Sequence, residues 1–263
     1  MYEVVELHNT WSSLAGISLF GLIGLWKGNP TGDLRYALGY FILVLIGLGS
    51  AGLHGTLHWV FQSSDGKKNT LICIDMFLKS PIEFTPSSSF IELPMIYLVT
   101  LMNFMAVEVD SPRNNPAYPR LPLILSIIMV VNTFVYYTFQ HLYFVFITTY
   151  TCLSTYHFYL AYITMFKNNK GGKVCRSLFL WSQGSYLGGF LFWLVDMLLC
   201  DYSNLGKGMT FHVIWHFGAG FGGYLIIVTY EICRARALNI KCELAFLFGL
   251  IPYAKRLEDV KRD

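Results

Sequence analysis

The sequence contains little charge. Of its 263 residues, 13% are Asp, Glu, Lys or Arg, whereas soluble domains carry about 25%. So few charged side chains cannot coat a globule of this size, which excludes a soluble enzyme and a disordered chain. The formal net charge of +3 is too small to attract a polyanion, so we expect no nucleic-acid partner. Because 54% of the residues are hydrophobic, the composition predicts one membrane domain.

Cysteine is also sparse, and its spacing is irregular. The six cysteines include no Cys-x-x-Cys pair, so the sequence predicts neither a disulfide scaffold nor a thiolate metal site. A basic stretch ahead of the first apolar run is missing too, since Glu3 and Glu6 occupy that region. We therefore expect no cleavable signal peptide.

Long apolar runs, separated by polar connectors, dominate the chain. A membrane-spanning helix needs about 20 mostly apolar residues. Seven runs approach this length, at residues 10–26, 36–61, 93–107, 121–139, 142–166, 178–199 and 210–232. The sequence thus predicts an all-α protein, a seven-transmembrane helix bundle that forms a single domain over residues 1–263.

The distribution of Lys and Arg predicts how this bundle is oriented. Fifteen of the 19 basic residues fall in the connectors and tail on one side of the predicted membrane. Basic residues accumulate on the cytosolic side. We therefore expect a luminal N-terminus and a cytosolic C-terminus, with residues 234–263 as a cytosolic tail.

Residues 66–91 differ from the rest of the chain. This segment is rich in Ser, Pro and Lys, and it holds three of the four basic residues on the predicted luminal side. Its 26 residues are unusually many for a connector within a compact bundle. We interpret it as an insertion that forms a luminal loop between the second and third spans.

Three histidines inside the predicted spans suggest a metal site. His212 and His216 are four residues apart, so they share one helix face. His54 lies late in the second span, at a depth similar to that of His212 early in the seventh. Three histidines plus one water make a catalytic zinc arrangement. The alternative is that each histidine only hydrogen-bonds the backbone or Ser and Thr of a neighbouring span. His58, one turn beyond His54, is expected outside the site.

Two further polar residues are candidates for the chemistry itself. Ser50 lies one turn before His54 and can donate its hydroxyl to an oxyanion beside the metal. Its small-residue surroundings also fit plain helix packing. Asp65 follows His54 by 11 residues, and a carboxylate near a zinc-bound water acts as general base and then acid. The alternative for Asp65 is a solvated loop charge.

Four motifs, in order along nearly the whole chain, give a resemblance. They are GSAGLH at 49–54, ELPMIY at 92–97, GFLFWLVD at 189–196 and FHVIWH at 211–216. The chain resembles the alkaline ceramidases, which are seven-span zinc amidases of ceramide. The resemblance implies that His54, His212 and His216 bind zinc and that Ser50 assists the oxyanion. We expect Tyr97 and Trp215 to contact the lipid substrate, although aromatic residues in spans also serve as packing or interface anchors.

The sequence departs from that family in two places. The family's catalytic Asp directly precedes Glu-Leu-Pro-Met, whereas Ile91 stands there in this chain. Removing residues 66–91 would join Asp65 to Glu92 and restore the motif, so we hypothesise a retained intron. The family also binds calcium through a luminal N-terminal stretch, of which only Glu6 has a counterpart here. One carboxylate cannot build a calcium site, and Cys200 would lack its disulfide partner. We expect the chain as written to be inactive or nearly so.

The resulting functional expectation is a membrane hydrolase. A zinc-activated water would cleave the amide bond of ceramide or phytoceramide, releasing a sphingoid base and a fatty acid, in the endoplasmic reticulum or Golgi membrane. The expected partners are the lipid substrate and the bilayer, without an obligate protein partner. The alternatives are a zinc-bearing seven-span receptor of the adiponectin-receptor type and an inactive ceramidase isoform.

Overall fold

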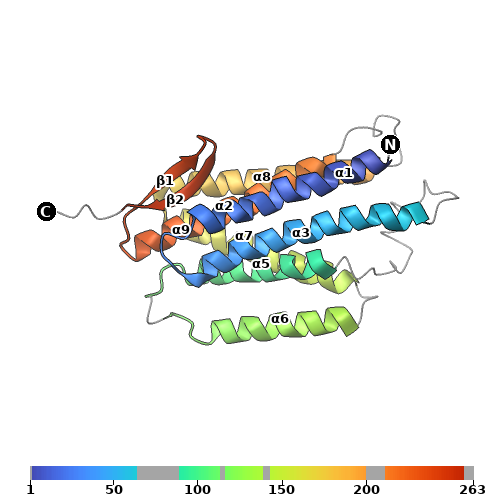
Figure 1. The fold of residues 1–263 in the computed structure, drawn as a ribbon. Helices are drawn as coiled ribbons and strands as arrows, with labels where there is room; N and C mark the ends of the chain where they lie inside the picture. The colour runs from blue at the N-terminus through green and yellow to red at the C-terminus, as the bar shows by residue number, and fades with distance from the viewer. Residues whose placement is uncertain (1, 64–88, 113–115, 139–142, 200–210, 258–263) are drawn as a thin grey trace.

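The structure is a computed structural model that describes residues 2–63, 89–112, 116–138, 143–199 and 211–257. These residues form mostly helices that run side by side along one direction (Figure 1). The first helical segment is continuous from residue 2 to residue 27 and contains a single π-helical turn. The last helix is followed by a β-hairpin. The elements are α1 (Tyr2–Ser13), η1 (Leu14–Ser18), α2 (Leu19–Lys27), α3 (Leu34–Ser63), α5 (Ser89–Val107), α6 (Leu121–Thr138), α7 (Tyr143–Tyr162), η2 (Ile163–Lys167), α8 (Gly172–Leu199), α9 (Phe211–Ala237), β1 (Cys242–Leu247) and β2 (Ile251–Arg256).

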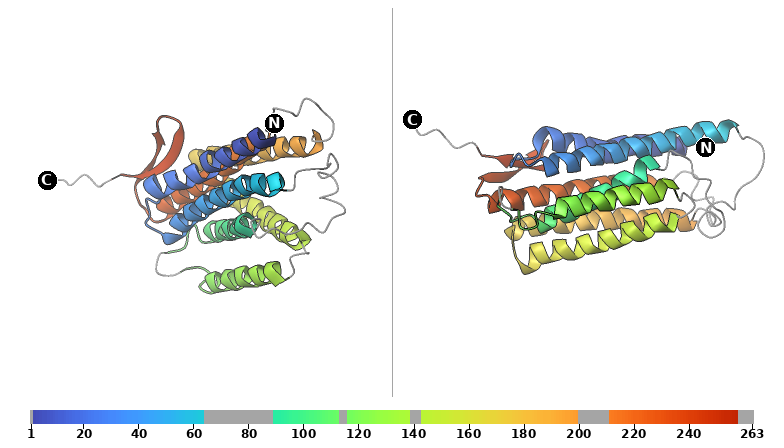
Figure 2. Two further views of the ribbon diagram at one scale, coloured as in Figure 1. Left: turned by 45° about the vertical axis from the view of Figure 1, so that its right-hand side comes forward. Right: turned by 90° about the horizontal axis from the view of Figure 1, so that it is seen from below.

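Helix α9 is the centre of the bundle. Its residues from Tyr224 to Ala235 are all buried, and they form much of the main apolar core. Helices α1, α2, α3, α5 and α8 all contact α9, and α8 packs along most of its length. Because α1 begins at one end of the bundle and α9 ends at the other, the chain crosses the bundle an odd number of times (Figures 1 and 2).

Three helices among the described residues are long and apolar enough to cross a membrane. The qualifying stretches are Leu34–Gly55 in α3, Gly172–Asp196 in α8 and Phe211–Ala237, which is α9. Helix α6 is shorter and lies at the edge of the bundle (Figure 1). It exposes a continuous apolar surface that suits contact with lipid, formed by Leu123, Ile124, Ile127, Val130, Val131 and Phe134. These features indicate a membrane protein, whereas the seven-span arrangement and its orientation stay predictions.

Two parts of the chain differ from the sequence-based expectation. Residues Ser89–Ile91, which we assigned to the inserted loop, form the first turn of α5. The C-terminal segment is not purely helical or irregular, because β1 and β2 pair antiparallel, with Cys242 opposite Arg256 and Leu247 opposite Ile251. Gly249 in the three-residue turn has φ +74°, a conformation that glycine adopts without strain. The expectation of an all-α protein is therefore wrong for this hairpin.

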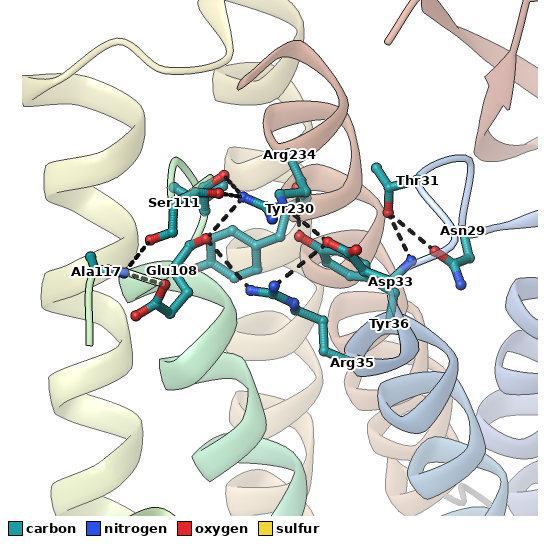
Figure 3. Close-up of polar contacts among 11 residues, drawn as sticks. Asn29, Thr31, Asp33, Arg35, Tyr36, Glu108, Ser111, Ala117, Tyr230 and Arg234 are labelled. Carbon is teal, nitrogen blue, oxygen red and sulfur yellow. Dashed lines mark hydrogen bonds and ion pairs between the residues drawn. The ribbon is translucent and has the colours of Figure 1, made fainter. Parts of the chain in front are cut away.

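A buried polar network closes the bundle at the end where α9 finishes (Figure 3). Arg234 on α9 is 1% exposed, so it belongs to the bundle and not to a solvated tail. Its guanidinium pairs with Asp33 at 2.9 Å and donates to the carbonyls of Glu108, Val109 and Ser111, just past the end of α5. A cation at a helix C-terminus stabilises the unpaired carbonyls there. One side chain of α9 thus holds both the α2–α3 and the α5–α6 connections.

A second buried charge on α9 holds the same end of the bundle. The Glu231 carboxylate accepts hydrogen bonds from the backbone N–H of Asn29 at 2.6 Å and from the Tyr40 hydroxyl at 3.0 Å. The α5–α6 connection is tied by Glu108, whose carboxylate accepts the N–H groups of Ala117 and Tyr118. This end of α9 is therefore fixed, and the helix extends from it to the opposite end, where the predicted histidines lie.

Candidate metal centre

Three histidines from two helices come together at the end of the bundle away from Arg234. His54 belongs to α3, and His212 and His216 belong to α9. One ring nitrogen from each lies within 4.8 Å of the other two. The ring centroids are 5.1 Å apart for His54 and His212, 5.3 Å for His54 and His216, and 4.6 Å for His212 and His216.

Helical geometry explains this convergence. Side chains four residues apart project from one helix face, which places His212 directly before His216 on the side of α9 that faces α3. Helix α3 runs opposite to α9, so its late residue His54 reaches the depth of the first turns of α9. The burial is graded: His216 is 2% exposed, whereas His54 and His212 are half-buried. The cluster thus opens on one side.

The donor set fits a zinc ion. At Zn–N distances of ~2.0–2.1 Å, the nitrogens of a tetrahedral site lie roughly 3.4 Å apart, so small side-chain rotations bring the three nitrogens into place. Three histidines also leave the fourth tetrahedral position open, as catalytic zinc sites do. Zinc binding itself stays a prediction.

Helix α1 supplies a second layer of contacts to the cluster. The Ser12 Oγ lies 2.7 Å from His216 Nδ1, and the Ser13 Oγ lies 3.3 Å from the same nitrogen. Both hydroxyls donate their single hydrogen to the Asn9 carbonyl, at 3.1 and 2.8 Å. With both hydrogens on that carbonyl, the hydroxyls accept from the imidazole in the tautomer that carries its hydrogen on Nδ1. That tautomer presents the Nε2 lone pair of His216 to a metal.

Ser50 occupies the position that the sequence predicted, beside the histidines. Its Oγ lies 2.9 Å from the Ser13 Oγ and 3.4 Å from His216 Nε2. The residue is 5% exposed on α3, one turn from His54. Its hydroxyl is thus next to the nitrogen that faces the proposed metal, where a donor can reach the oxygen of a bound carbonyl.

Two glycines permit η1, directly after α1, to approach α9 closely enough for these contacts. A Cβ added to Gly220 would lie 1.8 Å from the carbonyl oxygen of Gly16, and a Cβ on Gly16 would lie 3.0 Å from the Phe217 nitrogen. Any larger residue at Gly220 must push the helices apart. Small residues of this kind are how spanning helices pack backbone to backbone.

Sequence reasoning missed the contribution of Ser12, Ser13 and Asn9. All three are buried on one face of α1. Two serines and an asparagine at the start of an apolar run are a signal of a buried polar face. Their target on α9, however, is set only by the packing of the first and last helical segments.

Several predicted site residues are not placed by the structure. Asp65 lies outside the described residues, as do the side chains of His58 and Glu6, although Glu6 falls within α1. The roles of Asp65 as proton carrier and of Glu6 as a residual calcium ligand therefore stay predictions.

The two predicted substrate-contacting aromatics pack against neighbouring helices. Trp215 meets Tyr186 and Phe190 of α8 edge-on, with ring centroids 5.3 and 6.1 Å apart. The Tyr97 hydroxyl hydrogen-bonds the Thr133 hydroxyl of α6. Both are half-buried, so each retains an accessible edge. Their contact with a substrate stays a prediction.

Comparison with known proteins gives a consistent result over the whole chain. The model of the Ceramidase family matches residues 1–255. Alkaline ceramidase 3 of Mus musculus is 26% identical over 266 residues, covering 95% of this chain and 85% of the mouse protein. Putative alkaline ceramidase dcd3A of Dictyostelium discoideum is 25% identical, covering 88% of this chain and 81% of its own.

Proposed function

The chain belongs to the ceramidase family, and on that premise we propose that it hydrolyses the amide bond of ceramide or phytoceramide with zinc-activated water. The products are a sphingoid base and a fatty acid. The observation that carries the proposal is the convergence of His54, His212 and His216 beside the Ser50 hydroxyl, at one end of the bundle.

Each residue of the site has a separate role in the proposed hydrolysis. A zinc ion held by the three histidines supplies Lewis acidity and a water of lowered pKa. Ser12 and Ser13 hold the imidazole of His216 in the tautomer that presents Nε2. Ser50 donates its hydroxyl to the amide carbonyl oxygen as negative charge develops there. Asp65 takes the proton from the attacking water and returns it to the leaving amine.

The membrane setting suits the substrate. Ceramide is a two-chain lipid that does not leave the bilayer, so its hydrolase must act at the membrane. The half-buried edges of His54 and His212 leave the site open on one side. We place the protein in the endoplasmic reticulum or Golgi membrane, with the histidine cluster at the luminal end.

Metal analysis and a lipid assay on the same preparation test this function. Purified full-length protein in nanodiscs is expected to hold one zinc per chain, and a variant lacking residues 66–91 is expected also to release sphingoid base from a panel of ceramides. His216→Gln is expected to lose both zinc and turnover. His8→Gln changes an exposed histidine of α1 and is the matched control, which retains both.

The same assay separates the alternatives. Zinc binding without turnover, in the 263-residue chain and in a variant lacking residues 66–91, would favour a receptor over a hydrolase. Zinc content unchanged in His216→Gln would refute the histidine site.

A further inference from the structure

The turn of the β-hairpin exposes large apolar side chains. Phe248 is 86% exposed, Leu250 is 79% exposed and Phe246 is 54% exposed. Residues 244–254 contain no charged side chain. An apolar patch of this kind marks an interaction surface.

Strand β2 of the hairpin is fixed to the bundle. Pro252 and Ala254 are buried, and the Tyr224 hydroxyl of α9 donates to the Pro252 carbonyl oxygen at 2.7 Å. Ala254 is part of the main core. The exposed turn is therefore held in a set position and is not a loose tail.

The hairpin lies beside the end of α2, where the side chains are of the kind found at a membrane interface. The chain from Tyr253 to Arg256 lines a shallow pocket together with residues Trp26 to Gly32, at the end of α2. There Trp26 is 67% exposed, and the Lys27 Nζ lies 3.8 Å from the centre of its ring. Exposed Trp beside a basic residue is typical of the interface between bilayer and water. The hairpin projects sideways from this end of the bundle (Figures 1 and 2).

Charge at the hairpin base complements a lipid surface. Within residues 241–257, Lys241, Lys255 and Arg256 flank the apolar stretch, against one acidic residue, Glu243. The Lys255 Nζ lies 3.8 Å from the Glu243 carboxylate. Basic residues beside an apolar wedge bind anionic headgroups while the wedge enters the interface.

We propose that the hairpin turn inserts into the interfacial layer of the bilayer at this end of the bundle. Phe246, Phe248 and Leu250 enter the headgroup region, and the basic residues at the base contact anionic lipid phosphates and carboxylates. The inserted hairpin thereby fixes the C-terminal end of α9 relative to the membrane surface. This inference stands apart from the catalytic proposal, because it uses the opposite end of the bundle.

Site-specific photocrosslinking tests the proposal on the full-length protein. Phe248 is replaced with p-benzoylphenylalanine, and the protein is reconstituted in phosphatidylcholine nanodiscs with or without phosphatidylserine. Illumination is expected to yield a protein–phospholipid adduct by mass spectrometry. The matched control carries the probe at Glu243, an exposed residue at the base of the same hairpin, and is expected to yield several-fold less.

A second measurement tests the contact between the basic residues and anionic lipid. In discs with both lipids, the Phe248 probe is expected to capture phosphatidylserine above its share of the mixture. The Lys255→Gln and Arg256→Gln double variant is expected to remove this enrichment while keeping the lipid adduct. A Phe248 probe that captures only protein, or nothing, would overturn the insertion. Equal lipid capture at positions 243 and 248 would overturn it as well.

Discussion

The Ser12 hydroxyl lies 2.7 Å from Nδ1 of His216, and this contact joins the first helical segment to the last. The Ser12 hydroxyl also donates to the Asn9 carbonyl, an arrangement that suits the tautomer of His216 with its hydrogen on Nδ1. A histidine ligand that donates its second ring nitrogen is held in one tautomer and one orientation. Ser12 is therefore expected to control metal affinity without touching the metal.

Replacing Ser12 tests this relationship. Loss of such an outer contact costs about 10–100-fold in metal affinity, so Ser12→Ala is expected to weaken zinc binding by that factor in competition with a chromophoric chelator. Ser18→Ala removes another buried hydroxyl of the same helical segment, one that donates to the Val44 carbonyl. It is expected to leave zinc affinity unchanged. Equal affinities in the wild type and Ser12→Ala would contradict the role.

Ser50 is expected to affect turnover more than metal content. Removing one hydrogen-bond donor to a developing oxyanion costs about 10²–10³-fold in kcat, so Ser50→Ala in the variant lacking residues 66–91 should lose turnover by that factor with KM little changed. Zinc content measured on the same sample should stay near wild type. The control is Ser182→Ala, whose hydroxyl donates to the Gly222 carbonyl. A loss of zinc in Ser50→Ala would instead assign Ser50 a structural role.

Arg234 is expected to dominate stability at the other end of the bundle. Removing one partner of a buried ion pair costs about 3–5 kcal/mol. Arg234→Met leaves Asp33 with Arg35 at 3.6 Å as its ion-pair partner and removes a donor to the carbonyls beyond α5, so a loss at the lower end of that range is expected. A large drop in Tm is expected in detergent, measured by thermal unfolding. Arg120 is exposed in the α5–α6 connection, so Arg120→Met is the matched control and should shift Tm little.

Deleting residues 66–91 is expected to raise activity. The deletion places Asp65 directly before Glu92, at the start of α5, where a helix holds it. In the 263-residue chain Asp65 is tethered only through residues that follow α3, and ordering such a group costs entropy. A misplacement of ~1 Å costs about 10²-fold, so at least that gain in ceramide turnover is expected. Asp65→Ala in the deleted form should abolish it. Equal turnover by both forms would contradict our interpretation of the insertion.

The orientation of the bundle gives a further prediction. Because basic residues cluster in the connectors at the end of α9 and in the tail, a tag after residue 263 should be digested by protease added to sealed microsomes. A tag at the N-terminus should be protected until detergent is added. Protection of the C-terminal tag would reverse the assignment.

Much of the histidine cluster could be predicted from the sequence, because helical periodicity and the order of the spans determine which histidines come close. The spacing of His212 and His216 and the order of the spans place them near His54, as the structure has them. The contacts of Ser12 and Ser13 could not be predicted in this way. They depend on the close approach at Gly16 and Gly220, which are about 200 residues apart and carry no periodic signal.

The C-terminal hairpin was missed for a different reason. Residues 244–254 form an apolar run too short for a spanning helix, so we interpreted them as part of a cytosolic tail. Gly249 at the centre of that run is a hairpin signal, and it marks the turn in the structure. Arg234 was likewise assigned to the tail because it is charged. Its burial follows from partners contributed by distant connections, which sequence pattern does not reveal.

The π-helical turn η1 separates two faces of the first helical segment. It lies directly after Ser13, and past it Gly21 and Gly24 of α2 face Tyr40 and Val44 of α3. A π turn takes up one extra residue, which rotates everything before it by roughly 100° relative to a regular helix. The serines before the π turn can thus face His216, while the glycines after it face α3, within one continuous helical segment. Deleting one residue of η1 would therefore rotate the serines away from His216 while the glycines of α2 stayed against α3.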